Sequence, residues 1–320
     1  MTARQGGPQS SDLEHREFLV EVAWLCHEYG LTQAAIAARF GLSRSTISRA
    51  LSEAEALGIV QVVVTEPMPG QARLAEALRL RYGIMAHVGA RLGDEDGTIG
   101  VARATARLIE RAVAIGRVTV AASWGRTLAR AAHLVRPRRT TGVVVVDAIG
   151  HVSGGEIAPA VDVTRALGAS LGATVMHLPS PAFVDSRSSL QSLLSSRPVE
   201  TALEVARSAD MTLVSVGVVG EDSLLLQAGL VSAETMHAIV EAGGVGEMLG
   251  RYYDSSGHAL GVLSPLPVGL SLDELRGSRR VVAAAGGAAK ASALHAALIG
   301  GLLDEVVVDE ALGEALIMAR

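Results

Sequence analysis

Two groups of side chains in this sequence have the types and spacing needed to bind phosphate groups. The first group combines hydroxyls and guanidinium groups within six consecutive positions: Arg44, Ser45, Thr46, Ser48 and Arg49. Such side chains hydrogen-bond to the phosphates and base edges of DNA from the N-terminal end of a helix that enters the major groove. We therefore predict that these five residues bind DNA.

The second group lies in three glycine-rich segments further along the chain, SWGRT, GGVGEM and AGGAAK. Its candidate ligand-binding residues are Ser123, Gly125, Arg126, Thr127, Glu247, Gly286, Gly287 and Lys290. Hydroxyls and glycine amides at the start of a helix favour an anion, because the N-terminal end of a helix is positive. Lys290 is the single lysine beside 27 arginines, and its compact ammonium suits a tight phosphate pocket.

Glu247 differs from the other members of this group, because a carboxylate accepts hydrogen bonds from sugar hydroxyls. Each candidate also has a purely structural explanation. Glycine is common at strand–helix turns for geometric reasons, an acid often starts a helix, and Lys290 could be an ordinary surface residue. Taken together, SWGRT and AGGAAK indicate an anion site, and Glu247 indicates a polyol contact.

A pair of short helices joined by a tight turn would position the first group. Ile36, Ala37 and Phe40 recur at helical spacing and form one apolar face. Gly41 then supplies the left-handed residue that ends many helices, and Ser43 is a good N-cap for the next one. A plain antiparallel helix pair shares part of this pattern, but the turn, the cap and the basic face together favour a helix-turn-helix.

The charge distribution limits how this region binds DNA. The chain has a net charge of −5, and residues 1–66 hold five arginines against eight acids. Residues 31–51, in contrast, contain three arginines and no acid. Attraction to phosphates is therefore local, and we expect two or more copies to bind DNA together.

The chain divides most naturally at PMPG, residues 67–70. We predict a helix-turn-helix domain over 1–66 and a second domain over 67–320 that binds an anion and a polyol. In the first domain, residues 1–12 are expected to be disordered, residues 13–29 to form an amphipathic helix, and IVQVVVTE (59–66) to form a strand, a candidate wing.

From residue 84 onward, predicted strands alternate with helices, which is typical of a parallel sheet covered on both faces. The strands are Ile84–Val88, Val118–Ala122, Val143–Ala148, Thr174–Leu178, Thr212–Val216, Val281–Ala285 and Glu305–Val308. The helices are Thr98–Ile115, Thr127–Val135, Val161–Leu171, Val199–Arg207, Ala233–Ala242, Ala289–Ile299 and Glu310–Ala319. A hairpin around Ser255–Gly257 interrupts the alternation. The fold class is thus an all-α (winged) helix-turn-helix domain followed by an α/β parallel-sheet domain.

The composition argues against several other classes of protein. Hydrophobic residues make up 49% of the chain, but no apolar run is long enough to span a membrane. The polar N-terminus lacks a secretory signal, and the lone Cys26 fits a reducing compartment, so we expect a cytoplasmic protein with no membrane partner. The nine histidines form no metal motif, and no nucleophile elbow or P-loop is present. We predict no metal, no cofactor and no catalytic residue.

Six segments in a fixed order resemble the SorC/DeoR-type sugar-binding transcriptional regulators of bacteria. They are LTQAAIAARFGLSRSTISRALSEAEALGIV, SWGRTL, PSPAFV, GGVGEMLGRYYD, AAAGGAAKASALHAAL and VVVDEALGEAL. The resemblance implies a second domain with the fold of glucosamine-6-phosphate deaminase and ribose-5-phosphate isomerase. It also implies a phosphorylated sugar as effector, and homodimers or homotetramers on operator DNA. The family's phosphate-binding positions correspond to Ser123, Gly125, Arg126, Thr127, Gly287 and Lys290, and its sugar-binding carboxylate corresponds to Glu247. The VDAIGH and SVGVVGEDS segments depart from the family pattern, which leaves the sugar unidentified.

The leading hypothesis is a DNA-binding regulator of carbohydrate metabolism genes that responds to a sugar phosphate. The alternative is a sugar-phosphate isomerase or deaminase whose N-terminal helices serve oligomerisation. Such an enzyme needs a positioned base, for which Glu247, Asp185 or Asp309 are candidates. A nucleotide-binding Rossmann protein is a third interpretation, but the chain lacks the GxGxxG fingerprint.

Overall fold

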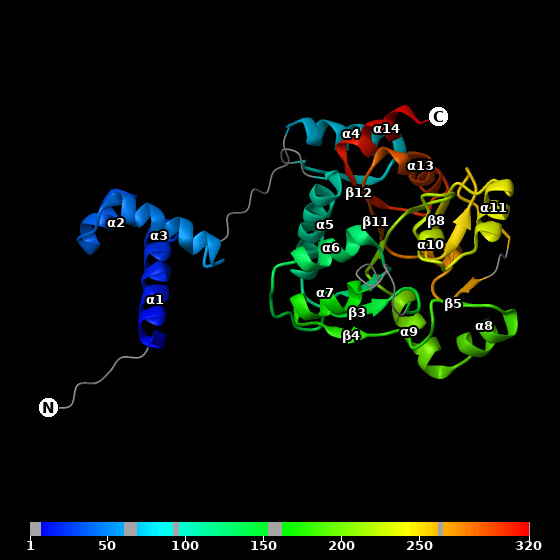
Figure 1. Cartoon of the computed structure of the whole chain (residues 1–320), viewed down its shortest axis with the longest axis horizontal. Coiled ribbons are helices and arrows are strands. Elements are labelled where there is room, and N and C mark those ends of the chain that lie inside the picture. The colour runs from blue at the N-terminus through cyan, green and yellow to red at the C-terminus, as the bar shows by residue number, and fades with distance from the viewer. Residues whose placement is uncertain (1–7, 61–68, 92–95, 153–161, 262–264, 320) are drawn as a thin grey trace. The chain divides into compact units, whose positions relative to one another are not determined.

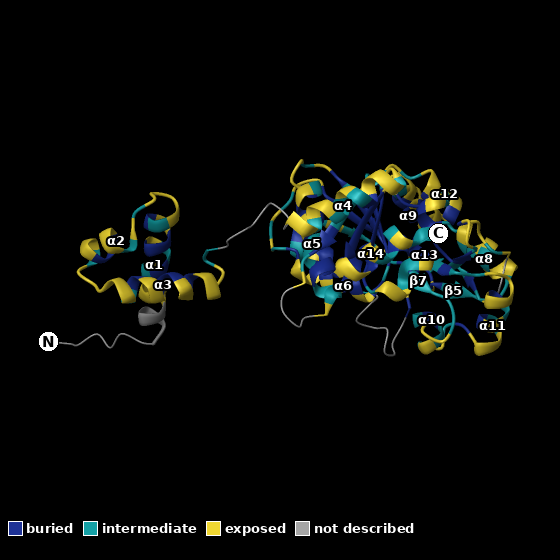
Figure 2. Ribbon diagram, turned by 90° about the horizontal axis from the view of Figure 1, so that it is seen from above, coloured by how far each residue is buried: buried dark blue, intermediate teal, exposed yellow. Residues whose placement is uncertain are grey.

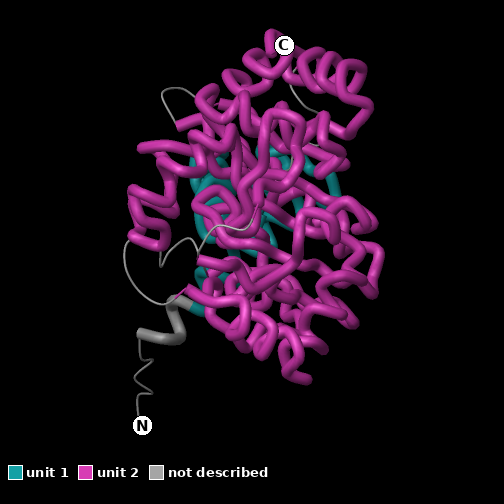
Figure 3. Tube along the Cα trace, turned by 90° about the vertical axis from the view of Figure 1, so that its right-hand side faces the viewer, with its two compact units in different colours: residues 1–66 teal, residues 67–320 magenta. Residues whose placement is uncertain are grey.

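The computed structural model describes residues 8–60, 69–91, 96–152, 162–261 and 265–319. Contacts within the chain group it into two units, residues 1–66 and residues 67–320 (Figure 3). The predicted wing strand falls largely on residues 61–66 and so lies outside the described residues.

The first unit contains three helices, α1 (Pro8–His27), α2 (Gln33–Phe40) and α3 (Arg44–Ala56) (Figure 1). Its core is made by apolar residues from all three, including Leu19, Val22, Ile36, Ile47 and Leu51, each at most 7% exposed (Figure 2). Since α1 already begins at Pro8, the expectation of disorder through residue 12 is wrong for residues 8–12.

The turn between α2 and α3 confirms the predicted helix-turn-helix. Gly41 ends α2 in the left-handed conformation, with φ of 66°, which glycine adopts without steric cost. Ser43 caps α3, because its Oγ accepts a hydrogen bond from the Thr46 amide at 3.1 Å. Thr32 caps α2 in the same way through the Ala35 amide at 3.2 Å. At the N-terminal ends of α2 and α3, a side chain therefore accepts a hydrogen bond from one of the free backbone amides.

The second unit is built on a seven-stranded parallel sheet in the order β1-β12-β11-β6-β2-β3-β4. The strands are β1 (Met85–Gly89), β2 (Thr119–Ala122), β3 (Val144–Asp147), β4 (Thr174–Met176), β6 (Met211–Val214), β11 (Val281–Ala285) and β12 (Glu305–Asp309). All seven predicted strands are confirmed, with ends shifted by at most two residues. The strands β6, β11 and β12 are buried at every position, and β11 and β12 are rich in valine and alanine, as expected for a sheet covered on both sides.

Helices cover this sheet on both faces (Figure 1). The described helices of the second unit are α4 (Pro69–Tyr82), α5 (Gly97–Val113), α6 (Arg126–Leu134), α7 (Val163–Leu171), α8 (Arg187–Leu194), α9 (Arg197–Arg207), α10 (Leu224–Gln227), α11 (Ala233–Glu241), α12 (Leu272–Arg276), the 3-10 helix η2 (Ala288–Lys290), α13 (Ala291–Ile299) and α14 (Glu310–Met318). One core cluster joins α5, α6 and α7 to the sheet, and another joins α4, α9, α13 and α14 to it. A further cluster joins α10 and α11 to β9. The seven predicted helices are confirmed, whereas the short α8, α10 and α12 were not predicted.

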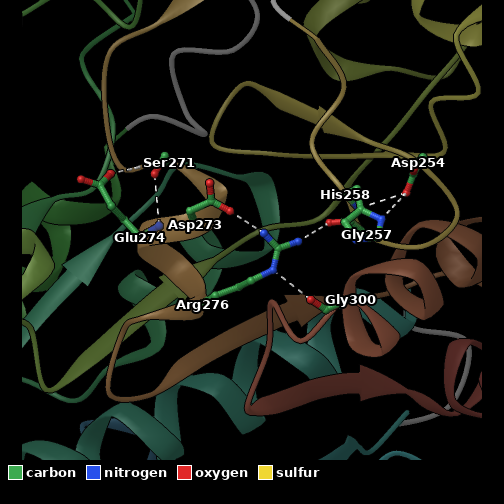
Figure 4. Close-up of polar contacts among 8 residues, drawn as sticks. All are labelled: Asp254, Gly257, His258, Ser271, Asp273, Glu274, Arg276 and Gly300. Atoms are coloured by element: carbon green, nitrogen blue, oxygen red, sulfur yellow. Dashed lines mark hydrogen bonds and ion pairs between the residues drawn. The ribbon is translucent and has the colours of Figure 1, made fainter.

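Two small antiparallel sheets lie outside the main sheet. One is formed by β7 (Gly217–Val218), β8 (Gly246–Met248) and β9 (Arg251–Tyr253), and the other by β5 (Phe183–Val184) and β10 (Leu266–Pro267). The predicted hairpin turn follows β9, where Tyr253 bridges to Ala259. It is held by the Arg276 guanidinium, which donates to the Gly257 and Gly300 carbonyls and to Asp273 (Figure 4). None of the described helices is long and apolar enough to cross a membrane.

Candidate functional site

The outward side of α3 presents the residues predicted to bind DNA. Arg44, Ser45, Ser48 and Arg49 are exposed, while Ile47, Ala50 and Leu51 are buried on the opposite side. Thr46 is only half-buried, and its hydroxyl lies 2.8 Å from the Ser43 Oγ. The structure thus leaves four of the five predicted side chains on the surface and places Thr46 partly in the capping network.

The second candidate site is a cavity of about 260 Å³ in the second unit. It lies where β2, β6 and β11 end, at the edge where ligands bind in open parallel sheets. Residues from distant parts of the chain line it: Asp96, Thr98, Ser123, Trp124, Gly125, Arg126, Thr127, Arg130, Ser215, Val216, Gly217, Val218, Asp222, Leu224, Leu225, Glu247, Leu249, Gly286 and Lys290. Seven of the eight predicted ligand-binding residues line this one cavity, and Gly287 does not.

The loop before α6 approaches the neighbouring strand closely. Gly125 precedes the first residue of α6 with φ of 152°, and no side chain caps this helix. A Cβ atom at Gly125 would lie 2.0 Å from the Ser215 Oγ, so only glycine fits here. Arg126 and Thr127 follow as the first residues of α6, whose free amides make its N-terminal end an anion-binding position.

The hydroxyls of Ser123 and Ser215 lie next to this loop, and they differ in their hydrogen bonds. The Ser123 Oγ donates to the Trp124 carbonyl at 3.1 Å and accepts from the Ser215 amide at 3.2 Å. Ser123 therefore holds β2 and β6 together as well as lining the cavity. The Ser215 Oγ is buried and has no hydrogen-bond partner among the described residues.

Lys290 and Arg126 place two positive charges at this cavity. Burial lowers the pKa of the Lys290 ammonium, and the nearby Arg126 guanidinium lowers it further. Among the described residues, neither side chain makes a hydrogen bond or an ion pair. An anion between them would relieve their mutual repulsion, so the pair favours a phosphate or a similar group.

Gly287 does not line the cavity, but its backbone amide makes a structural hydrogen bond. Its amide donates to the Asp309 Oδ2 at 2.8 Å, while the Asp309 Oδ1 accepts from the Leu312 amide at 2.8 Å. Asp309 is 7% exposed and caps α14. It also fixes the glycine turn that leads into η2 and so positions Lys290.

Glu247 lies on β8, at the wall of the cavity. Burial raises the pKa of its carboxyl to about 7, against the opposing effects of the Gly250 amide, Lys290 and Arg251. The Gly250 amide donates to the Glu247 Oε1 at 2.5 Å. A carboxyl with this pKa accepts hydrogen bonds when ionised and donates one when protonated, which suits recognition of a polyol.

Several lining residues were not predicted as site residues. Ser215, Gly217 and Asp222 belong to the SVGVVGEDS segment, which departs from the family pattern. Arg130 lies one turn after Arg126 on α6, a spacing that could have indicated it. Its guanidinium donates to the Thr98 Oγ1 at 2.7 Å.

A separate cavity of about 310 Å³ lies at the ends of β2, β3 and β4. It contains Gly150 and His151, together with Asp147 and His177, whose side chains are joined by a 3.0 Å hydrogen bond. Among the described residues, no group of three His, Cys, Asp or Glu side chains could hold a metal ion.

Comparison with known proteins decides which family this arrangement represents. Residues 66–318 match the family model described as "Putative sugar-binding domain", and residues 22–73 match a MarR family model. The chain belongs to the SorC/DeoR-type family of sugar-binding transcriptional regulators. The match to the sugar-binding family spans the whole α/β unit, and the second match spans the helix-turn-helix.

Relatives within this family align along almost their full length. The deoxyribonucleoside regulator of Bacillus subtilis is 29% identical, covering 96% of this chain and 99% of that protein. The erythritol catabolism regulatory protein EryD of Brucella abortus is 28% identical, covering 93% and 95%. The structure of the full-length sorbitol operon regulator SorC from Klebsiella pneumoniae superimposes with a TM-score of 0.80 at 25% identity, covering 94% and 98%.

These comparisons confirm the prediction of an effector-binding transcriptional regulator. They do not support the alternative of a sugar-phosphate isomerase or deaminase, since the matched relatives and solved structures are transcriptional regulators. The predicted fold, a helix-turn-helix unit followed by a parallel α/β unit, is confirmed by the same match.

Proposed function

We propose that this SorC/DeoR-type regulator binds operator DNA through α3 as a homodimer or homotetramer and is controlled by a phosphorylated sugar. The observation that supports this most strongly is the cavity that joins the uncapped start of α6 to Arg126, Lys290 and Glu247. The phosphate would lie against the α6 amides and the two cations. The sugar hydroxyls would lie toward Glu247.

The relatives support a carbohydrate or nucleoside catabolic gene set as the target. Their names describe regulators of deoxyribonucleoside, erythritol and sorbitol genes. The ligand would act by its different affinity for two arrangements of the oligomer, a coupling of about 1–3 kcal/mol in typical allosteric proteins. A regulator of this kind acts where the chromosome lies, so we place it in the cytoplasm.

A panel of pentose and hexose phosphates, each paired with its unphosphorylated sugar, tests the ligand class. We expect one or more phosphates to raise the melting temperature of the full chain without being converted, and the matching free sugars to have much smaller effects. The same phosphates should change the mobility shift of a DNA fragment taken from upstream of the protein's own gene. Turnover of a sugar phosphate, or equal stabilisation by free sugar and sugar phosphate, would contradict the proposal.

A further inference from the structure

A stripe of side chains runs along α1 on the side away from the core of the first unit. It consists of Leu13, Glu17 and Trp24, which are exposed, and Val20, which is half-buried, at successive spacings of four, three and four residues. With 3.6 residues per turn, these positions fall on one side of the helix. Leu13 is 60% and Trp24 56% exposed, although large apolar side chains at such spacing usually face a partner. We call this face the α1 stripe.

Charged side chains border the α1 stripe asymmetrically. Arg16 lies on one side of it and Glu21 on the other, and both are exposed. In a parallel pair of helices the two-fold axis runs along the helices, so opposite sides of the stripe meet. Arg16 of each copy then lies beside Glu21 of the other. It also lies beside the partner's Glu17, whose charge it offsets.

An antiparallel pair gives the opposite result. Its two-fold axis is perpendicular to the helices, so the same side of the stripe meets itself, with Glu21 near Glu21 and Arg16 near Arg16. Like charges at such positions oppose pairing, and interhelical ion pairs commonly set helix orientation. The charge pattern therefore selects the parallel arrangement.

We propose that the α1 stripe is an interaction surface that packs in parallel against the α1 stripe of a second copy of this chain. In each copy α1 is joined to α3 through the shared core and through His15, whose Nε2 lies 2.8 Å from the Glu53 Oε1. Pairing of the stripes consequently fixes the separation of two α3 helices about a two-fold axis. Its consequence for DNA rests on the proposed function, since a two-fold pair fits a site with two related halves.

Site-specific crosslinking of the full chain tests the surface without DNA or effector. Replacing the sole cysteine, Cys26→Ser, gives a background into which Val20→Cys is introduced. In a parallel pair the two residues at position 20 face one another, so a short bis-maleimide should link them into a covalent dimer. Arg39→Cys, on an exposed position of α2, is the matched control and should give little dimer.

Mixing two singly substituted proteins tests the orientation. Leu13→Cys and Trp24→Cys should each crosslink to themselves, whereas an antiparallel pair would link one to the other in the mixture only. That mixed product, or no crosslink at position 20, or equal crosslinking at position 39, would overturn the proposal. Each of these outcomes is measured without operator DNA. A failure of the proposed pairing can therefore be distinguished from a failure of the proposed function.

Reversing the charge of Arg16 or Glu21 tests, in the same crosslinking assay, whether these residues form an ion pair between the two copies. Arg16→Glu or Glu21→Arg alone should slow crosslinking at position 20 by about fivefold, and the double reversal should restore it, because the ion pair then forms with exchanged signs. Trp24→Ala should slow crosslinking as well, while Tyr29→Ala, an exposed aromatic outside the α1 stripe, should not. A double reversal that fails to restore the rate would show that Arg16 and Glu21 are not partners.

Discussion

The two candidate phosphate-binding regions present positive charge in different ways. On α3, Arg44 and Arg49 are exposed to solvent, so each attracts phosphate weakly and in a manner that salt screens. In the cavity, burial and the neighbouring Arg126 already lower the pKa of Lys290. A cation that has lost its water gains more from an anion than an exposed one does. The first region therefore depends on the number of contacts, and the second on the fit of one ligand.

The regions also differ in how much of the chain is needed to form them. The α3 face requires only α1, α2 and α3, whose core lies within one unit. The cavity brings together segments from β2, β6, β8 and β11 and the start of α5. Substitutions in α3 should consequently change DNA binding alone, and substitutions in the cavity should change the ligand response alone.

The largest effect is expected from Lys290→Ala. Removal of the half-buried ammonium takes away one of the positive charges proposed to bind the phosphate, and we expect affinity for the effector to fall by about 100-fold or more. Calorimetry with the phosphate identified by the ligand panel measures this. Affinity for DNA in the absence of effector should equal that of the parent, and Arg111→Ala, on the exposed side of α5, controls for loss of a positive charge. An unchanged effector affinity would place the phosphate elsewhere.

The substitutions Arg44→Ala and Arg49→Ala test whether the exposed arginines of α3 bind DNA. Each should weaken binding to the upstream DNA fragment by about 10- to 100-fold and should lower its dependence on salt. Thermal stabilisation by the effector should persist in both variants. If a mobility shift at two salt concentrations shows parental affinity and slope, α3 is not the helix that contacts DNA.

The first region could be predicted almost completely from the sequence, because local rules determine it. Gly41 and Ser43 act through their own backbone neighbours, and the buried face follows helical spacing. The seven strands could be predicted for a similar reason, as buried parallel strands are short apolar runs. The start of α1 was missed because residues 8–12 are polar and carry no apolar pattern.

The cavity could be predicted only in part. Glycine-rich turns after strands indicated Gly125, Gly286 and Lys290, since their function begins with local geometry. Ser215 could not be found in this way, because its importance comes from contact with Gly125, about ninety residues earlier in the chain. For the same reason the sequence could not show that Asp309 binds the Gly287 amide.

The substitution Glu247→Gln tests how the ionisation of a cavity residue affects the stability of the protein at different pH values. Burial raises the pKa of Glu247 from 4.5 to about 7, so the folded protein holds a proton that the unfolded chain releases between these values. Stability is therefore lost as pH rises through this range. Glutamine is neutral at all pH values. The free energy of unfolding of the variant should therefore exceed that of the parent by about 1–3 kcal/mol at pH 8 and differ little from it at pH 5.

Urea unfolding at the two pH values measures this difference. Glu241→Gln, which removes an exposed carboxylate from α11, is the control and should not reproduce the gain at pH 8. A variant with the same advantage at pH 5 as at pH 8 would show that the effect of Glu247 does not come from its ionisation.

The smallest effect is expected at the α3 cap, where stability and DNA binding can be separated. Ser43→Ala removes the acceptor of the Thr46 amide and should cost about 1 kcal/mol in the first unit. Ser43→Asp keeps a capping oxygen and should retain stability, but its negative charge faces DNA phosphates beside Arg44 and should weaken DNA binding more than Ser43→Ala does. Circular dichroism melts and mobility shifts of both variants provide the test. Equal DNA affinity for the two variants would mean that the start of α3 does not lie near the DNA backbone.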